Sequence, residues 1–129
     1  MDRITQEIEL LRRFYPDLEY VGEGRWVLLS QLPVPAEPGW SSQRIDVAVQ
    51  FPPGYPAQKP YGFHVRPVLS LASGAEVQNV TASSDPPWPG PWQKFSWDAP
   101  AWFASSDVKE GSNMLNYVLT FVDRLRMGA

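Results

Sequence analysis

The chain has no cysteine and only one histidine, His64, among its 129 residues. The lack of cysteine excludes disulfide bonds, thiolate metal sites and thiol nucleophiles. A zinc site needs three or four ligands, so one histidine with scattered carboxylates predicts no metal centre, and we expect no cofactor. A Ser-His-Asp triad would have to use His64, and the G-x-S-x-G, G-x-G-x-x-G and P-loop patterns are all missing.

Long hydrophobic runs are missing as well. The longest span only a few residues, as in Trp26–Leu29, so we expect no membrane segment. The N-terminus has no basic stretch followed by an apolar one, which predicts no secretory signal and hence a cytoplasmic protein. The net charge of −3, from 11 basic and 14 acidic residues, argues against nucleic acid or an anionic membrane as the main partner.

Proline and tryptophan are the residues in excess. Proline accounts for 14 of the 129 residues, about twice the usual ~5%. Four of the six tryptophans lie between residues 88 and 102. The hydrophobic content of 43% predicts a folded chain, and the length predicts one domain over residues 1–129.

Two segments have helical periodicity, one near each end of the chain. Residues 2–15 are predicted to form an amphipathic helix that Pro16 ends. A second helix is predicted over about 107–126, where Asp107 and Glu110 have the spacing of a capping box. A glycine inside this second segment favours a later start.

Short strands are predicted between the two helices. They are Leu18–Val21, Arg25–Leu32, Gln43–Phe51 and Tyr61–Val65. Gln43–Phe51 alternates cleanly, with Ile45, Val47 and Val49 on one face. Residues 66–91 show no sustained periodicity and are predicted to be a long irregular segment, and the tryptophan-rich stretch after them a packed loop. This order predicts an α+β fold, in which an antiparallel β-meander has both helices on one side.

The order of elements, with Phe51-Pro52-Pro53-Gly54-Tyr55-Pro56 after the third strand, resembles the ubiquitin-conjugating (UBC) fold. A closer resemblance is to the prokaryotic UBC-like family E. Three stretches carry it: FPPGYPAQKPYGF (51–63), PWQKFSWDAPAW (91–102) and DVKEGSNMLNYVLTFVDRL (107–125). The UBC fold implies a long irregular active-site segment between the strands and the C-terminal helix.

Family E carries a W-x-x-[FW]-S-x-H element followed by a further tryptophan. Trp92, Phe95, Ser96 and Trp102 match this element, and Asp98 stands where the histidine is usual. The His-Pro-Asn triplet and the catalytic cysteine of ubiquitin-conjugating enzymes have no counterpart in this chain. The resemblance is therefore one of fold, without the usual thioester chemistry.

The resemblance implies a role in a bacterial ubiquitin-like conjugation pathway. The implied partners are a ubiquitin-like protein, a ThiF-like adenylating enzyme and a JAB-type peptidase encoded nearby. Some of these systems pass the modifier through a serine ester, which is compatible with a chain without cysteine. The alternative is a catalytically inactive UBC-like module that binds the modifier or the activating enzyme, and a third reading is a Trp/Pro-rich peptide-binding domain.

Serine chemistry would have Ser96 as the nucleophile. If this segment is extended, Asp98 shares a face with Ser96 and can accept or orient its proton. His64 is the better base by chemistry, and Asn79 is a candidate amide donor to an oxyanion. The alternative nucleophiles are Ser83 and Ser84. Each residue has a structural alternative as a packed serine, a turn aspartate, a core histidine or a loop asparagine.

Six residues are candidates for contact with partner proteins. In UBC-like folds the first helix often contacts the activating enzyme, which makes Arg12 and Arg13 candidates there. Trp and Tyr are frequent at binding hot spots, which adds Tyr55, Trp92, Trp97 and Trp102. The alternatives are a solvated helix surface for the arginines and core packing for the aromatic residues.

Overall fold

The computed structural model describes residues 1–99 and 101–129. Its α-helices are α1 (Arg3–Phe14), α2 (Met114–Leu119) and α3 (Phe121–Met127), and a short 3₁₀ helix, η1, spans Glu23–Arg25. Its strands are β1 (Glu19–Val21), β2 (Trp26–Pro33), β3 (Arg44–Gln50), β4 (Tyr61–Arg66), β5 (Val80–Ser83) and β6 (Trp92–Asp98). The prediction of an α+β fold with an antiparallel sheet is confirmed.

The strands form one sheet in the order β1-β2-β3-β4-β6-β5. The first four make the predicted meander, but β6 then inserts between β4 and β5, so the sheet is larger than the sequence pattern indicates. Two expectations were wrong. Residues 66–91 contain the edge strand β5, which is short and mostly exposed, and the tryptophan-rich stretch is the strand β6 rather than a loop.

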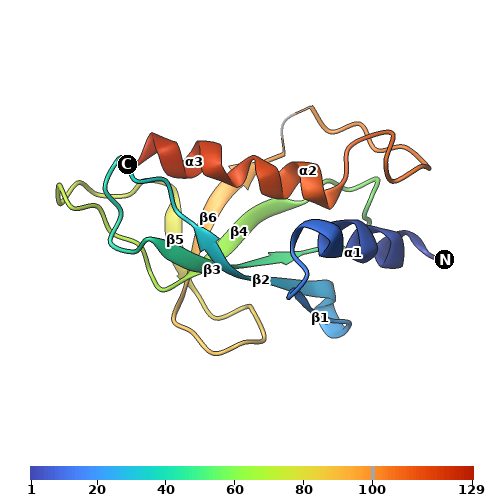
Figure 1. The fold of residues 1–129 in the computed structure, drawn as a ribbon, viewed down its shortest axis with the longest axis horizontal. Coiled ribbons are helices and arrows are strands. Elements are labelled where there is room, and N and C mark those ends of the chain that lie inside the picture. The colour runs from blue at the N-terminus through green and yellow to red at the C-terminus, as the bar shows by residue number, and fades with distance from the viewer. Residues whose placement is uncertain (100) are drawn as a thin grey trace.

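The three α-helices cover one face of the sheet (Figure 1). Leu11 of α1 and Met114 and Phe121 of the C-terminal helices belong to the same buried cluster as the inward side chains of β2, β3, β4 and β6. In β3 these inward residues alternate as predicted, since Val47 and Val49 face the helices. Burial of this apolar surface is the main favourable contribution to folding.

The opposite face of the sheet has an aromatic cluster in place of a helix. Trp26, Leu28, Ala48 and Trp92 are buried there. The Trp26 ring also meets the His64 ring edge to face, with 5.3 Å between the ring centroids. These side chains shield the centre of the face from water, so the sheet is buried on both sides there.

The C-terminal helix begins later than the predicted boundary. The Asp107 carboxylate accepts a hydrogen bond from the Lys109 N–H within a turn, so it does not cap the helix. Asn113 is the N-cap instead, and its side chain accepts from the Asn116 N–H. The helix is also divided at Thr120 into α2 and α3. Ser and Asn side chains compete with helical hydrogen bonding, which favours a cap at this point.

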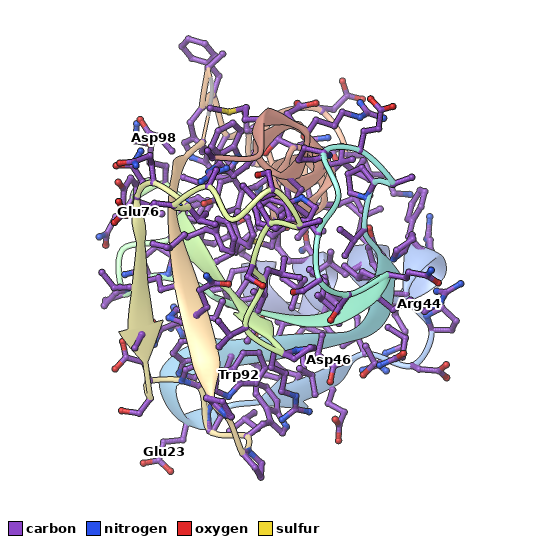
Figure 2. All side chains as sticks on the ribbon, turned by 90° about the vertical axis from the view of Figure 1, so that its left-hand side faces the viewer. Glu23, Arg44, Asp46, Glu76, Trp92 and Asp98 are labelled. Atoms are coloured by element: carbon purple, nitrogen blue, oxygen red, sulfur yellow. The ribbon has the colours of Figure 1, made fainter. Side chains whose placement is uncertain are left out.

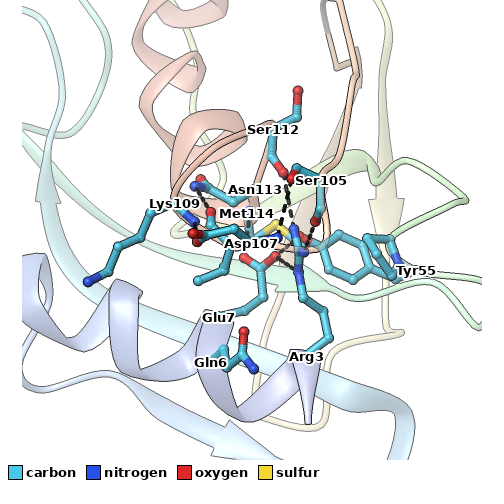
Figure 3. Close-up of polar contacts among 12 residues, drawn as sticks. Arg3, Gln6, Glu7, Tyr55, Ser105, Asp107, Lys109, Ser112, Asn113 and Met114 are labelled. Atoms are coloured by element: carbon cyan, nitrogen blue, oxygen red, sulfur yellow. Dashed lines mark hydrogen bonds and ion pairs between the residues drawn. The ribbon is translucent and has the colours of Figure 1, made fainter. Parts of the chain in front are cut away.

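A buried carboxylate joins α1 to the C-terminal half of the chain (Figure 3). Glu7 accepts hydrogen bonds from Arg3 Nε at 2.8 Å, the Tyr55 hydroxyl at 2.5 Å and the Met114 N–H at 2.9 Å. Arg3 also donates to two backbone carbonyls of the loop before α2. The start of α1, the proline-rich loop and the start of α2 therefore meet at one side chain.

None of the helices in residues 1–99 and 101–129 is long and apolar enough to cross a membrane.

Candidate functional site

Ser96 lies on β6 where the pairing of the sheet is irregular. The register between β4 and β6 shifts there, so that Ser96 and Trp97 together lie opposite Gly62. This arrangement is a β-bulge, a feature that re-aims side chains and is over-represented next to active sites. The Ser96 side chain is exposed, while Trp97 packs against the core under the helices.

The backbone of the bulge is held from two directions. On the edge side, the Ser96 N–H donates to the Asn79 carbonyl oxygen at 2.9 Å. On the helix side, the Tyr117 hydroxyl donates to the Trp97 carbonyl oxygen at 2.6 Å, and Trp97 Nε1 donates to Thr120 Oγ1 at 2.9 Å. Ser96 is therefore exposed to solvent on a backbone that has little freedom to move.

The Tyr117 hydroxyl is a buried donor at all ordinary pH values. Burial raises its pKa above the usual tyrosine range, the nearby Gly62 amide partly offsets this, and the Asp98 charge raises it further. A protonated hydroxyl is required for the hydrogen bond to the Trp97 carbonyl, so this contact persists at neutral pH.

Asp98 ends β6, at the opposite end of the strand from Trp92 (Figure 2). Its carboxylate pairs with Lys59 Nζ at 2.8 Å, and both side chains are about half exposed. The prediction that Asp98 shares a face with Ser96 assumed an uninterrupted strand, and the bulge between them interrupts that alternation. Among the described residues, no hydrogen bond joins the two side chains, so a proton-accepting role for Asp98 stays a prediction.

His64 lies on β4 directly opposite Lys94 of β6. It is 5% exposed, and neither ring nitrogen has a hydrogen-bond partner among the described residues. Burial lowers the pKa of His64 to about 4, with a further contribution from the charge of Lys94. The ring is therefore neutral at pH 7, but among the described residues it makes no hydrogen bond to Ser96, and its assignment as general base also stays a prediction.

Asn79 is brought to Ser96 by the pairing of β5 with β6. Its φ of 60° lies in the left-handed region, which asparagine tolerates better than most residues. The preceding carbonyl, of Gln78, accepts from Arg124 Nη2 at 2.7 Å. Arg124 is 2% exposed and stacks over the Phe95 ring, so a buried cation of α3 fixes the start of β5.

The larger cavities lie away from this bulge. One of about 620 Å³ is at the start of α1 and includes Tyr20 and Arg25. A second, of about 370 Å³, is lined by the loop after β2 and includes Trp40, and a third, of about 350 Å³, lies under α3 and includes Leu125. None of the three includes Ser96. Within the described ranges, no three His, Asp or Glu side chains gather as metal ligands. An exposed residue outside these cavities suits a protein substrate better than a small molecule, which needs a concave site.

A family model described as Prokaryotic E2 family E matches residues 6–124. The chain belongs to this family. The match covers all but the ends of the chain, including β6 and the bulge. No curated protein and no solved structure matches the chain. Family E membership confirms the resemblance found in the sequence and points to a role in a bacterial ubiquitin-like pathway, with a ubiquitin-like protein as partner.

Two of the aromatic residues predicted to contact partners lie inside this family E domain. Tyr55 is 8% exposed and donates its hydroxyl to Glu7, and Trp92 is 2% exposed and donates Nε1 to the Trp88 carbonyl. A partner would find almost no side-chain surface at either position. Both side chains therefore pack the interior of the domain.

The other four partner candidates keep some exposed surface. Arg12 and Arg13 are exposed in the last turn of α1. Trp97 and Trp102 are partly buried, and Trp102 Nε1 donates to the Pro56 carbonyl at 2.9 Å, which ties the segment after β6 to the proline-rich loop. Contacts of these four residues with family E partners stay predictions.

Of the residues around Ser96, the sequence analysis named Asn79 but missed three others. Tyr117, Gly62 and Lys94 had no assigned role. The one usable signal was a glycine inside a strand pattern, which often marks a bulge or a close approach.

Proposed function

We propose that this family E protein is an acyl carrier. It accepts the C-terminal glycine of a ubiquitin-like protein from a ThiF-like adenylating enzyme, holds it as an ester on Ser96 and passes it to a target. The observation that carries the proposal is the exposed Ser96 at a β-bulge, within the stretch that matches the serine element of family E.

In the loading step, Ser96 Oγ attacks the carbonyl carbon of the activated glycine. The new carbon–oxygen bond forms as the bond to the leaving group on the activating enzyme breaks. Because Ser96 is exposed, its proton can pass to water if neither Asp98 nor His64 receives it. In the second step an amine of the target attacks the ester, an amide forms and the serine hydroxyl is restored.

Asn79 supports this chemistry by its position. The hydrogen bond from the Ser96 N–H to the Asn79 carbonyl places the two residues side by side on neighbouring segments. The Asn79 side chain is exposed and offers an amide N–H to the developing oxyanion.

The exposed end of α1 supplies the proposed contact with the activating enzyme. Arg12 and Arg13 add two positive charges to the last turn of the helix. A JAB-type peptidase is proposed as the enzyme that removes the modifier from targets. Exchange of both arginines for glutamate should weaken binding of the activating enzyme. Arg12 also donates to the Leu18 carbonyl at 3.2 Å, so Arg13→Glu alone is the variant that leaves this contact in place.

Reconstitution with the activating enzyme, the modifier and ATP tests the carrier proposal. Intact-mass analysis should show one added modifier, and hydroxylamine should remove it. Ser96→Ala should abolish the adduct, while Ser30→Ala, at an exposed serine of β2, should keep it. An adduct that survives Ser96→Ala would move the nucleophile to Ser83, Ser84 or a lysine.

The second candidate function is a UBC-like binding module without catalytic activity. It is favoured by the observation that, in the described part of the chain, Ser96 has no hydrogen bond to Asp98 or His64. A module of this kind would bind the loaded activating enzyme or the modifier and form no adduct. That result in the same reconstitution would replace the carrier proposal.

A further inference from the structure

The Lys94 side chain fills a slot beside Ser96. Lys94 precedes Ser96 by two residues on β6 and pairs with His64, whose ring meets Trp26 on the face of the sheet away from the helices. Its Cε lies 2.9 Å, and its Nζ 3.8 Å, from the point that a Cβ on Gly62 would occupy. Gly62 is the residue opposite Ser96 in the bulge, and its lack of a side chain lets the lysine lie across it.

The Lys94 ammonium has no carboxylate partner among the described residues. By contrast, Lys59 pairs with Asp98, and 2.8 Å separates its Nζ from a carboxylate oxygen. The charge of Lys94 acts on His64, where it helps to keep the ring neutral, while Asp85 acts in the opposite direction. A half-buried cation without a carboxylate partner next to an exposed hydroxyl is available for a negative charge that forms during a reaction.

We propose that Lys94 stabilises the oxyanion that forms when Ser96 attacks the modifier's C-terminal carbonyl. This inference rests on the proposed carrier function and assigns a further catalytic residue to it, beside Ser96 and Asn79. As the Ser96 Oγ–carbon bond forms, the carbonyl oxygen becomes negative and accepts a hydrogen bond from the ammonium. When the bond to the leaving group breaks, the carbonyl is restored and the hydrogen bond weakens.

The ammonium acts through its charge and its donors. A protonated lysine has no lone pair on its nitrogen and therefore does not accept the Ser96 proton, which leaves by the routes given above for the loading step. Removal of a buried oxyanion donor slows acyl transfer by about 10²–10³-fold. Lys94 is only half buried, so we expect Lys94→Met to slow formation of the Ser96 ester by roughly 10- to 100-fold.

The experiment measures single-turnover loading of the full chain from a saturating, charged activating enzyme. The variants are Lys94→Met, Lys94→Arg, which keeps the charge, and Lys109→Met, at an exposed lysine of the loop before α2. Lys94→Met should slow loading at saturation without changing the activating-enzyme concentration that gives half the maximal rate. Lys94→Arg should recover most of the rate, and Lys109→Met should match the wild type.

The lone histidine gives a second measurement that needs no partner protein. An NMR titration of His64 should show a higher pKa in Lys94→Met than in the wild type, because a cation opposite the ring has been removed. Lys94→Arg should leave that pKa close to the wild-type value. An unchanged pKa in Lys94→Met would overturn the placement of the ammonium.

The outcomes separate this inference from the function on which it rests. If the wild type forms a Ser96-dependent ester and Lys94→Met loads at the same rate, the role of Lys94 is wrong and the carrier function stands. If Lys94→Met loads slowly only because it binds the activating enzyme less tightly, the oxyanion role is also wrong. If the wild type forms no ester on Ser96, both proposals fall together.

Discussion

Replacement of the buried Glu7 carboxylate should destabilise the protein more than replacement of any one of its partners. The side chain is fully buried and accepts hydrogen bonds from Arg3 at 2.8 Å, Tyr55 at 2.5 Å and Met114 at 2.9 Å. Glu7→Ala leaves three donors without their acceptor at the junction of α1, the proline-rich loop and α2. The partners have other neighbours, but the carboxylate is common to all three contacts.

The magnitude follows from the burial of each group. Loss of one partner of a buried ion pair costs about 3–5 kcal/mol, and because the Arg3 side chain is 15% exposed, water can partly replace one contact. We therefore expect Glu7→Ala to lower the free energy of unfolding by about 3–4 kcal/mol. Glu7→Gln keeps an acceptor for the Met114 N–H but turns an NH₂ group toward the other donors, and should cost about 2 kcal/mol. Tyr55→Phe removes one hydrogen bond and should cost about 1.5 kcal/mol.

Urea unfolding followed by tryptophan fluorescence gives these free energies. Glu9→Gln, at an exposed residue of the same helix, is the matched control and should stay within about 0.5 kcal/mol of the wild type. If Glu7→Gln were as stable as the wild type, or if Tyr55→Phe cost more than Glu7→Ala, the carboxylate would not be what holds this junction together.

Three further predictions concern the region around the bulge. The pKa of His64 is about 4 in the folded protein against about 6.5 in the unfolded chain, so the unfolded state binds the proton more readily. Stability should therefore fall by about 3 kcal/mol as the pH drops from about 6.5 to about 4, and urea unfolding of His64→Phe should lack this dependence. Gly62→Ala should lower the free energy of urea unfolding by about 1–3 kcal/mol, because a φ of 82° strains an alanine and the new Cβ would lie 2.9 Å from Lys94 Cε. An unchanged stability would contradict the left-handed backbone at Gly62. Tyr117→Phe removes the hydrogen bond to the Trp97 carbonyl and should lower the free energy of unfolding by about 1–2 kcal/mol. Amide hydrogen exchange in this variant should then be faster at the bulge than elsewhere in β6. Uniform exchange along β6 would mean that the Tyr117 hydroxyl does not hold the bulge.

The first half of the fold follows from local pattern. An element with one buried face and one exposed face shows this in its own sequence, as a helical period in residues 2–15 and as alternation in Gln43–Phe51. The structure confirms these two elements as α1 and β3. The N-cap at Asn113 was missed because Asp107 with Glu110 matches the capping box, whereas Asn113 is followed three residues later by Asn116. A capping pattern indicates where a helix can begin, and the packing of the following residues decides between two such positions.

The second half depends on contacts between distant segments. The strand β6 pairs with β4 and β5, about 30 and 12 residues earlier in the chain, and no periodicity within one segment predicts that order. Ser96 was identified through the family resemblance, which identifies a residue but not its neighbours. The bulge, the slot over Gly62 and the placement of Lys94 all follow from strand register, and a shift of one residue would reverse every side chain involved.

The arrangement at Ser96 is consistent with what an oxygen nucleophile requires. The chain has no cysteine, so it has no nucleophile that a low pKa of its own would activate. For an oxygen nucleophile, the rate of acyl transfer must come from the position of the hydroxyl and from positive charge near the carbonyl oxygen. The bulge provides position, because its backbone is fixed by Asn79 on one side and by Tyr117 and Thr120 on the other. Lys94 provides positive charge on the face of the sheet that the helices do not cover. In the proposed carrier, the helices hold one side of β6 and the acyl donor approaches from the other. Buried changes in α2 should then alter the rate of Ser96 loading without touching the substrate.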